Sequence, residues 1–559
     1  MADEEEFDYI ICGGGTAGCV LASRLRQANP SLSIALIERG TNDASNAKIL
    51  NPLSVAELKS EGLQSVYWST PQPHLSNRRI ELHGGNVLSG SSATNYGVWM
   101  RGHRKDYDEW ARITGDERWS YGGLLPYFKR NETHFDSSGD EAQHGFRGPI
   151  KTALPTEFPL RKPFMEAFEK LGYQSNPDQN GGNPFGYGTL AVNWSPRRQP
   201  ASLAYDLSGV HVLCDSYAKK ILLERAKPDE EPRAIGVQVG TGEDQVRQLR
   251  ARKEVIVSCG AYRTPQLLML SGIGPRQQLL KFAVSVVVDN AEVGCNMFDH
   301  LGCSICFKLE PKAAEKGLAM GHPNFMANPK FMEIVPCETS TIDMLDPRKL
   351  AEALQADSGT ATISTQQLDA LQEQRAHLWI LPAYMPISLG ENYDVVPDGE
   401  HISILMMNFQ PTSRGAISLT SGTAADTPAV NPNYVTTQHD RLVMREGVRR
   451  ILQLVEQSSL RPYVAAEEPP IGQAPLTSTS TDEEIDSRIQ DNSTSIQHPA
   501  GTAAMGKVVD SQLRVKGVKG LRVCDASVFP APVAATTQAS VYALAESFAD
   551  LLLLQEESQ

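Results

Sequence analysis

The first chemistry that the sequence suggests comes from a cluster of glycines near its start. Residues 13–18 read GGGTAG and match the pattern G-x-G-x-x-G. In this pattern Gly13 permits a tight turn, Gly15 lets the backbone approach a pyrophosphate, and Gly18 lets a helix and a strand pack closely. Glu38 follows about 20 residues later, where an acid can accept a hydrogen bond from a ribose hydroxyl. The spacing predicts dinucleotide binding and leaves FAD and NAD open.

The glycines need flanking elements in a fixed order, and the sequence supplies them. Residues 8–12, DYIIC, form an apolar run that is typical of a buried parallel strand. Residues 19–25 carry small and apolar side chains at helical spacing, and residues 33–37 predict a second strand that ends at Glu38. A helix that begins at the glycines offers free N–H groups to phosphates. Without this order the glycines would indicate an ordinary turn, so the order favours a nucleotide site.

Composition excludes several other classes of function. Lys and Arg number 52 against 66 Asp and Glu, which gives a net charge of −14. An acidic chain binds a nucleic-acid backbone or an anionic membrane poorly, so we expect neither as a partner. We find no secretory signal, membrane-spanning run or peroxisomal address. The nine cysteines lack metal-ligand spacing and predict reduced thiols, no metal and a cytoplasmic location.

The rest of the chain alternates predicted strands and helices. We predict a strand and turn over 255–261, a short helix over 264–274, strands over 402–409 and 415–420, and an amphipathic helix over 439–457. Residues 310–380 are polar and lack the alternation of a strand, with short helices expected at 350–355 and 366–374. An insertion of this length often forms a lid.

Several blocks together give the chain a family resemblance. They read CGGGTAGCVLASRL, GNVLSGSSATNYGVWMRG, GAYRTPQLLMLSGIGP, VGCNMFDH, HPAGTAAMG and LRVCDASVFP followed by TQASVYALAE. Over nearly its whole length the chain resembles the glucose–methanol–choline (GMC) oxidoreductases, a family of flavoenzymes. The resemblance implies an α/β fold, with a Rossmann-like FAD-binding domain of discontinuous segments and an α+β substrate domain that has an antiparallel sheet. We place the FAD-binding domain at 1–155, 205–309 and 490–559, and the substrate-binding domain at 156–204 and 310–489.

The resemblance also implies FAD as the cofactor and assigns residues to it. These residues are Gly13, Gly15, Thr16, Ala17, Gly18, Glu38, Val87, Ser91, Asn95, Ala218, Asp525, Ala526, Thr537 and Gln538. Some relatives tether the flavin through a histidine, and the matching position here is Thr94, so we predict non-covalent FAD. The family's GGSS is replaced by SGSS, and the extra hydroxyl of Ser89 could alter flavin contacts.

Oxidation of an alcohol needs a base for the hydroxyl proton, and a neutral histidine suits this task. Among twelve histidines, His498 lies in QHPAGT, which resembles the family's catalytic-histidine block. We expect His83 and His300 to be structural. The family's second catalytic position, a histidine or asparagine, corresponds to Thr536. A threonine is no base at neutral pH, although it can orient a substrate oxygen.

Three functions follow from these residues. The favoured one is an FAD-dependent alcohol oxidase or dehydrogenase that transfers hydride to flavin N5, with His498 as base and oxygen or another compound as electron acceptor. By elimination, its substrate is a small aromatic or polyketide-like primary alcohol. The alternative is a non-redox or atypical cyclisation or dehydration of a secondary metabolite, because of Thr536. The third is flavin binding without catalysis. The sequence leaves the oligomeric state open.

Overall fold

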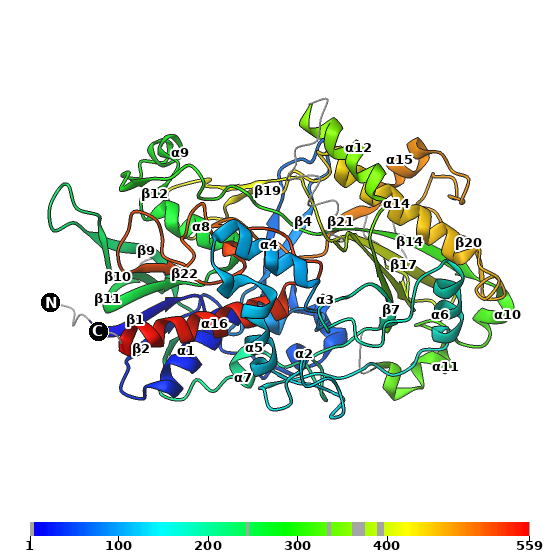
Figure 1. Cartoon of the computed structure of the whole chain (residues 1–559), viewed down its shortest axis with the longest axis horizontal. Coiled ribbons are helices and arrows are strands. Elements are labelled where there is room, and N and C mark those ends of the chain that lie inside the picture. Colours follow the sequence, from blue (N-terminus) through cyan, green and yellow to red (C-terminus); the bar gives the residue numbers. More distant parts are fainter. Residues whose placement is uncertain (1–4, 242–244, 333–336, 360–374, 388–395, 558–559) are drawn as a thin grey trace.

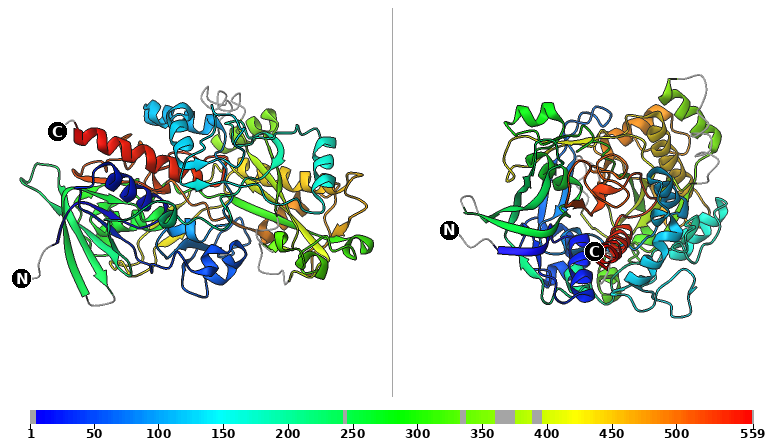
Figure 2. Two further views of the ribbon diagram at one scale, coloured as in Figure 1. Left: turned by 90° about the horizontal axis from the view of Figure 1, so that it is seen from below. Right: turned by 60° about the vertical axis from the view of Figure 1, so that its left-hand side comes forward.

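The computed structural model describes residues 5–241, 245–332, 337–359, 375–387 and 396–557. Two seven-stranded sheets lie at opposite ends of the molecule (Figures 1 and 2). Around and between them lie helices that include α4 (Arg104–Thr114), α5 (Tyr121–Asn131), α6 (Arg161–Lys170), α8 (Gly260–Leu270), α12 (Pro347–Ser358) and α15 (Asp482–Asn492). Two cores of buried apolar side chains fill the interior, one associated mainly with each sheet.

The first sheet gathers strands from three distant parts of the chain. Its order is β8 (His211–Leu213), β2 (Ile34–Ile37), β1 (Glu5–Cys12), β11 (Gln245–Val257), β10 (Arg233–Thr241) and β9 (Tyr217–Glu224), with β22 (Leu521–Val523) also on β11. Strands β8, β2, β1, β11 and β22 pair in parallel, whereas β10 and β9 add antiparallel strands. This is the parallel, Rossmann-like arrangement that the glycine motif requires.

The glycine motif lies at the end of β1, as predicted. Helix α1 (Thr16–Ala28) begins directly after Gly15, and β2 ends one residue before Glu38. A methyl group on Gly18 would lie 2.0 Å from the carbonyl oxygen of Gly13, so only glycine fits where the helix turns back over the strand. The sequence pattern therefore specified the local structure correctly.

The last helix, α16 (Gln538–Glu557), packs beside α1 and α5 (Figure 1). The fully buried carboxylate of Glu546 on α16 accepts hydrogen bonds from Arg24 of α1 at 2.8 and 2.9 Å and from Tyr205 at 2.8 Å. Arg130 of α5 forms a second ion pair with it, also at 2.8 Å. Loss of one partner would leave an uncompensated buried charge, so the two ends of the chain are firmly joined.

The second sheet is antiparallel. Its order is β20 (Val464–Glu467), β14 (Leu301–Leu309), β17 (His401–Asn408), β16 (Leu378–Ala383), β15 (Thr339–Asp343) and β7 (Gly186–Thr189), with β21 (Ser493–Ser495) also on β14. Helix α14 (Gln438–Val455) packs against it, which confirms the predicted amphipathic helix. The predicted strand over 402–409 is β17.

Three expectations about the later part of the chain need comment. Residues 310–380 were expected to lack strands, but β15 and the start of β16 lie there; all six residues of β16 are buried, so the strand has no polar face and shows no alternation. The helix expected at 350–355 is α12, whereas that at 366–374 falls outside the described residues. Strands β14 and β21 belong to the second sheet, whereas the proposed boundaries put them in the FAD-binding domain. The sheets therefore do not follow the boundaries at these two strands, and the division into domains stays a prediction.

All nine cysteines are described, and each is a free thiol, as expected. In the described part of the chain, no helix combines the length and apolar character needed to cross a bilayer.

The contact at Gly18 yields a stability prediction. Gly18→Ala should lower the free energy of unfolding by about 1–3 kcal/mol and reduce the amount of bound flavin, because the new methyl group forces helix and strand apart. Thermal unfolding and flavin absorbance per protein would measure both effects. Gly122→Ala in α5 is the matched control, since its methyl group would meet nothing closer than 3.8 Å. Equal stability and flavin content in the two variants would contradict the prediction.

Candidate active site

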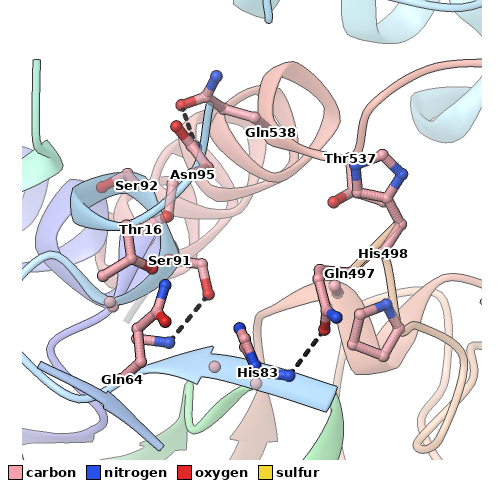
Figure 3. Close-up of a pocket in the computed structure, with 18 of the residues that line it drawn as sticks. Thr16, Gln64, His83, Ser91, Ser92, Asn95, Gln497, His498, Thr537 and Gln538 are labelled. Atoms are coloured by element: carbon pink, nitrogen blue, oxygen red, sulfur yellow. Dashed lines mark hydrogen bonds between the residues drawn. The ribbon is translucent and has the colours of Figure 1, made fainter. Parts of the chain in front are cut away.

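A cavity of about 990 Å³ is lined by residues from both sheets and from the C-terminal segment. Figure 3 shows part of it, with Thr16 and Ser91 on one side of the open space and His498 and Thr537 on the other. The cavity therefore brings together the glycine motif and the histidine block, which are separated by most of the chain.

One end of the cavity has the features of a nucleotide site. The carboxylate of Glu38 accepts hydrogen bonds from the backbone N–H groups of Gly14 at 2.9 Å and Gly40 at 2.8 Å. Burial raises the pKa of Glu38 to about 7, against these backbone hydrogen bonds, which favour the charged form. Gly15 precedes the first turn of α1 without a side-chain cap, and a methyl group there would have no neighbour closer than 3.9 Å. Space and free helix N–H groups suit a pyrophosphate.

The loop expected under the flavin packs directly on the glycine motif. A methyl group on Gly90 would lie 2.8 Å from the Cα of Gly15, and Ser89 donates its N–H to the carbonyl of Gly14 at 2.7 Å. The unusual hydroxyl of Ser89 does not line the cavity; it exchanges hydrogen bonds with Ser202 at 2.7 and 2.9 Å. Ser89, which departs from the family pattern, therefore anchors the loop to Ser202 on the side away from the cavity lining.

Most of the residues assigned from the sequence line this cavity. They are Gly13, Gly15, Thr16, Ala17, Glu38, Ser91, Asn95, Ala218, His498, Asp525, Ala526, Thr536, Thr537 and Gln538. Two others do not: Gly18 serves the packing of α1 on β1, and Val87 is fully buried behind the loop. These residues therefore lie together around one cavity. The contacts of each residue with a cofactor stay a prediction.

Asp525 has a structural task besides lining the cavity. One of its carboxylate oxygens accepts from the N–H of Gly260 at 2.9 Å and the hydroxyl of Thr264 at 2.6 Å, which holds the first turn of α8. The other accepts from the N–H of Ser527 at 2.7 Å. Burial raises the pKa of Asp525. The C-terminal segment is thereby fixed to the helix that follows β11.

His498 is held at two points by the dipeptide Asp299-His300. Asp299 accepts a hydrogen bond from the backbone N–H of His498 at 2.8 Å and from the hydroxyls of Tyr434 and Ser495 at 2.5 Å each. The Nδ1 atom of His498 lies 3.0 Å from Nδ1 of His300, with the two rings perpendicular at 89°. His300 was expected to serve only packing, but the pairing of β14 with β21 brings it beside the histidine block.

Both imidazoles are held in the neutral form. Burial lowers the pKa of His498 to about 4. Burial and the neighbouring His498 place the pKa of His300 well below its ordinary value. A neutral imidazole that faces the cavity is able to accept a proton.

Thr536 faces the cavity with its hydroxyl already engaged. The hydroxyl donates to the backbone carbonyl of Val98 at 3.0 Å, and the Gln538 amide donates to the same carbonyl at 3.4 Å. The Gln538 oxygen accepts from Asn95 at 2.9 Å and from Asn193 at 3.1 Å (Figure 3 shows the bond with Asn95). Thr536 therefore has lone pairs left to accept a hydrogen bond from a substrate, but no proton to donate.

The far end of the cavity is apolar. Trp379 and Leu381 of β16 lie opposite Met407 and Leu405 of β17, respectively, so the four side chains share one face of the sheet. Met320, Cys337, Met385, Pro386 and Ile387 continue this lining. Sequence reasoning missed these residues because it did not predict β16, and the pairing of β17 with β16 decides which face meets the cavity.

A nucleotide site that shares one cavity with a half-buried, neutral histidine is the arrangement expected of a nucleotide-dependent oxidoreductase. The family model for the N-terminal region of the GMC oxidoreductases matches residues 7–302, and the family model for their C-terminal region matches residues 411–545. The chain belongs to this family, and its cofactor is FAD. Glu38, the first turn of α1 and the open space at Gly15 fit the nucleotide part of that cofactor.

The similarity to known proteins extends over nearly the whole chain. The GMC-type oxidoreductase acuG of Aspergillus aculeatus is 41% identical, with 98% of this chain and 99% of acuG covered. An alcohol dehydrogenase [acceptor] of Pseudomonas putida is 32% identical, with 98% and 96% covered. A formate oxidase of Aspergillus oryzae, studied for modification of its FAD, has a TM-score of 0.89 at 26% identity, with 100% of each chain covered.

The residue at position 94 predicts how the cofactor is held. Thr94 lines the cavity where some relatives carry a tethering histidine, so acid precipitation of the protein should release all of the FAD into the supernatant. Absorbance of supernatant and pellet measures this directly. Yellow colour that stays with the denatured pellet would show a covalent bond and contradict the prediction.

Proposed function

We propose that the protein oxidises an uncharged, largely apolar primary alcohol, aromatic or polyketide-derived, to the aldehyde. The observation that carries this proposal is the neutral imidazole of His498 in the lining of the cavity that also holds the nucleotide site and the apolar face. When bound, FAD accepts a hydride from the alcohol carbon. His498 takes the hydroxyl proton, and oxygen or another compound removes the electrons and completes the cycle.

The lining of the apolar end supports the choice of substrate. None of the described cavity residues on β16 and β17 is charged, and Trp379 offers an aromatic surface that itself stacks on Phe409 at a centroid distance of 5.4 Å. On this face a carboxylate would lose its hydration without gaining a counter-charge, and a quaternary ammonium ion would meet the single aromatic ring of Trp379 in place of an aromatic cage. Apolar rings gain from burial there. Choline and formate, named for two of the similar proteins, are therefore poor candidates here.

Thr536 makes no hydrogen bond to the reacting oxygen in this proposal. Its own hydroxyl proton is directed to Val98, and the single hydroxyl proton of the alcohol goes to His498, so the Thr536 oxygen is left to accept from another donor group of the substrate. The same observation favours the second candidate, a ring closure or dehydration without net oxidation, because Thr536 cannot replace an ionisable partner. The two candidates differ in product mass: oxidation removes two hydrogens, dehydration removes water, and cyclisation by isomerisation leaves the mass unchanged.

Anaerobic mixing with a panel of alcohols tests the proposal. Benzylic and allylic primary alcohols should bleach the flavin, whereas choline and formate should not. His498→Ala should slow bleaching by roughly 10²-fold or more, because the hydroxyl proton then has no acceptor. A flavin that dithionite reduces but no alcohol reduces would refute alcohol oxidation, and a product formed without bleaching would favour the second candidate.

The low pKa of His498 predicts the pH dependence of flavin reduction. The base must be neutral, so kcat/KM should stay level down to about pH 5 and fall as the pH drops through about 4, where His498 becomes protonated. Stopped-flow reduction measures the profile, and circular dichroism at each pH confirms that the protein is folded. A decline that begins near pH 6.5, the ordinary value for histidine, would contradict the prediction.

A further inference from the structure

The two nitrogens of the His498 ring are chemically distinct because one of them contacts His300. A neutral imidazole carries its proton on one nitrogen and a lone pair on the other. The 3.0 Å contact between the two Nδ1 atoms contains one proton, which either His498 or His300 donates. If His300 donated it, His498 would carry its own N–H on Nε2 and could not accept a proton there. The direction of this hydrogen bond thus decides whether His498 is a base.

The geometry of the contact and the proposed base role together favour one direction. His300 is 1% exposed, and its Nε2 atom makes no close hydrogen bond with any described residue, so Nδ1 is the atom through which it acts on His498. The contact occupies Nδ1 of His498 and leaves Nε2 as the nitrogen that can take a proton from a substrate. A base needs a lone pair on that nitrogen, so the ring proton of His498 belongs on Nδ1. Nδ1 of His300 is then a lone pair that accepts from Nδ1–H of His498.

We propose that His300 is a positioning residue that fixes His498 as the Nδ1–H tautomer and so presents the Nε2 lone pair of His498 to the alcohol. This inference rests on the proposed base role of His498, and the NMR measurement below decides the tautomer independently of enzyme activity. Asp299 completes the arrangement, because its carboxylate binds the backbone of His498 and leaves the ring to His300.

A neutral partner has a different effect from the carboxylate that often orients a catalytic histidine. A carboxylate would stabilise the imidazolium and raise its pKa, whereas a buried imidazole orients the ring without adding negative charge. The arrangement matters more because Thr536 supplies no second ionisable group. His300, on the side of His498 opposite its Nε2 atom, is the residue that selects the basic nitrogen.

Nitrogen NMR of the holoenzyme tests the tautomer directly. In protein labelled with ¹⁵N-histidine, the ring signals of His498, identified by their loss in His498→Ala, should show the proton on Nδ1. His300→Asn should preserve this pattern, because the Asn oxygen can accept in place of Nδ1. His300→Leu has no acceptor and should lose it. A wild-type His498 protonated on Nε2 would overturn the proposal.

Flavin reduction supplies the second readout. His300→Leu should slow reduction roughly 10- to 100-fold at saturating alcohol, with little change in alcohol binding, and His300→Asn should recover most of the rate. His377→Leu is the matched control. This histidine is also neutral, it is half-buried, its Nδ1 has no partner in the described structure, and it does not line the cavity. The rate of flavin reduction in His377→Leu should stay near that of the wild type.

The outcomes separate this proposal from the proposed function. If the wild type is reduced by alcohols but His300→Leu is equally fast, or His300→Asn is as slow as His300→Leu, His300 does not act through its acceptor nitrogen. If no alcohol reduces the wild type, alcohol oxidation fails, and the NMR spectra still decide the tautomer.

Discussion

The buried carboxylate of Glu546 is the interaction on which the site depends. It holds α16 against α1 and α5 through Arg24, Arg130 and Tyr205. Helix α1 begins at the glycine motif, and α16 begins directly after the two threonines, so both helices start at the cavity. Fixing their position relative to each other therefore fixes the opposite walls of the site, although they come from the two ends of the chain.

The cavity joins two environments that favour different ligand parts. At the nucleotide end, the backbone N–H groups of Gly14 and Gly40 hold the Glu38 carboxylate in place, and the uncapped first turn of α1 offers free N–H groups to a polar cofactor. At the other end, cross-strand pairs of β16 and β17 present an apolar face. His498 lines the same cavity. A buried site with few charges keeps this imidazole neutral, which is what proton removal from an alcohol requires.

The two threonines have separate meanings in this structure. Thr537 lines the cavity among the residues assigned to the flavin, and Thr536 directs its proton to Val98. Thr536 stands where the resemblance places a histidine or asparagine, which leaves His498 as the one base among the residues assigned to catalysis. The histidine that contacts this base is His300, which directly precedes β14. Acid–base chemistry at the site is accordingly concentrated on one imidazole.

The sequence by itself determined the features that depend on neighbouring residues. The spacing of Gly13, Gly15, Gly18 and Glu38 specified a strand, turn and helix, because the steric demand for glycine is local. The motif blocks likewise singled out His498 and Thr536, whose catalytic roles stay a prediction, and both line the cavity. Only the tertiary structure decided what these residues contact. The bond between His300 and His498 depends on the pairing of β14 with β21, and the apolar face depends on the register of β16 with β17. Such contacts join residues far apart in the chain, and no local pattern encodes which side chains an antiparallel register brings together.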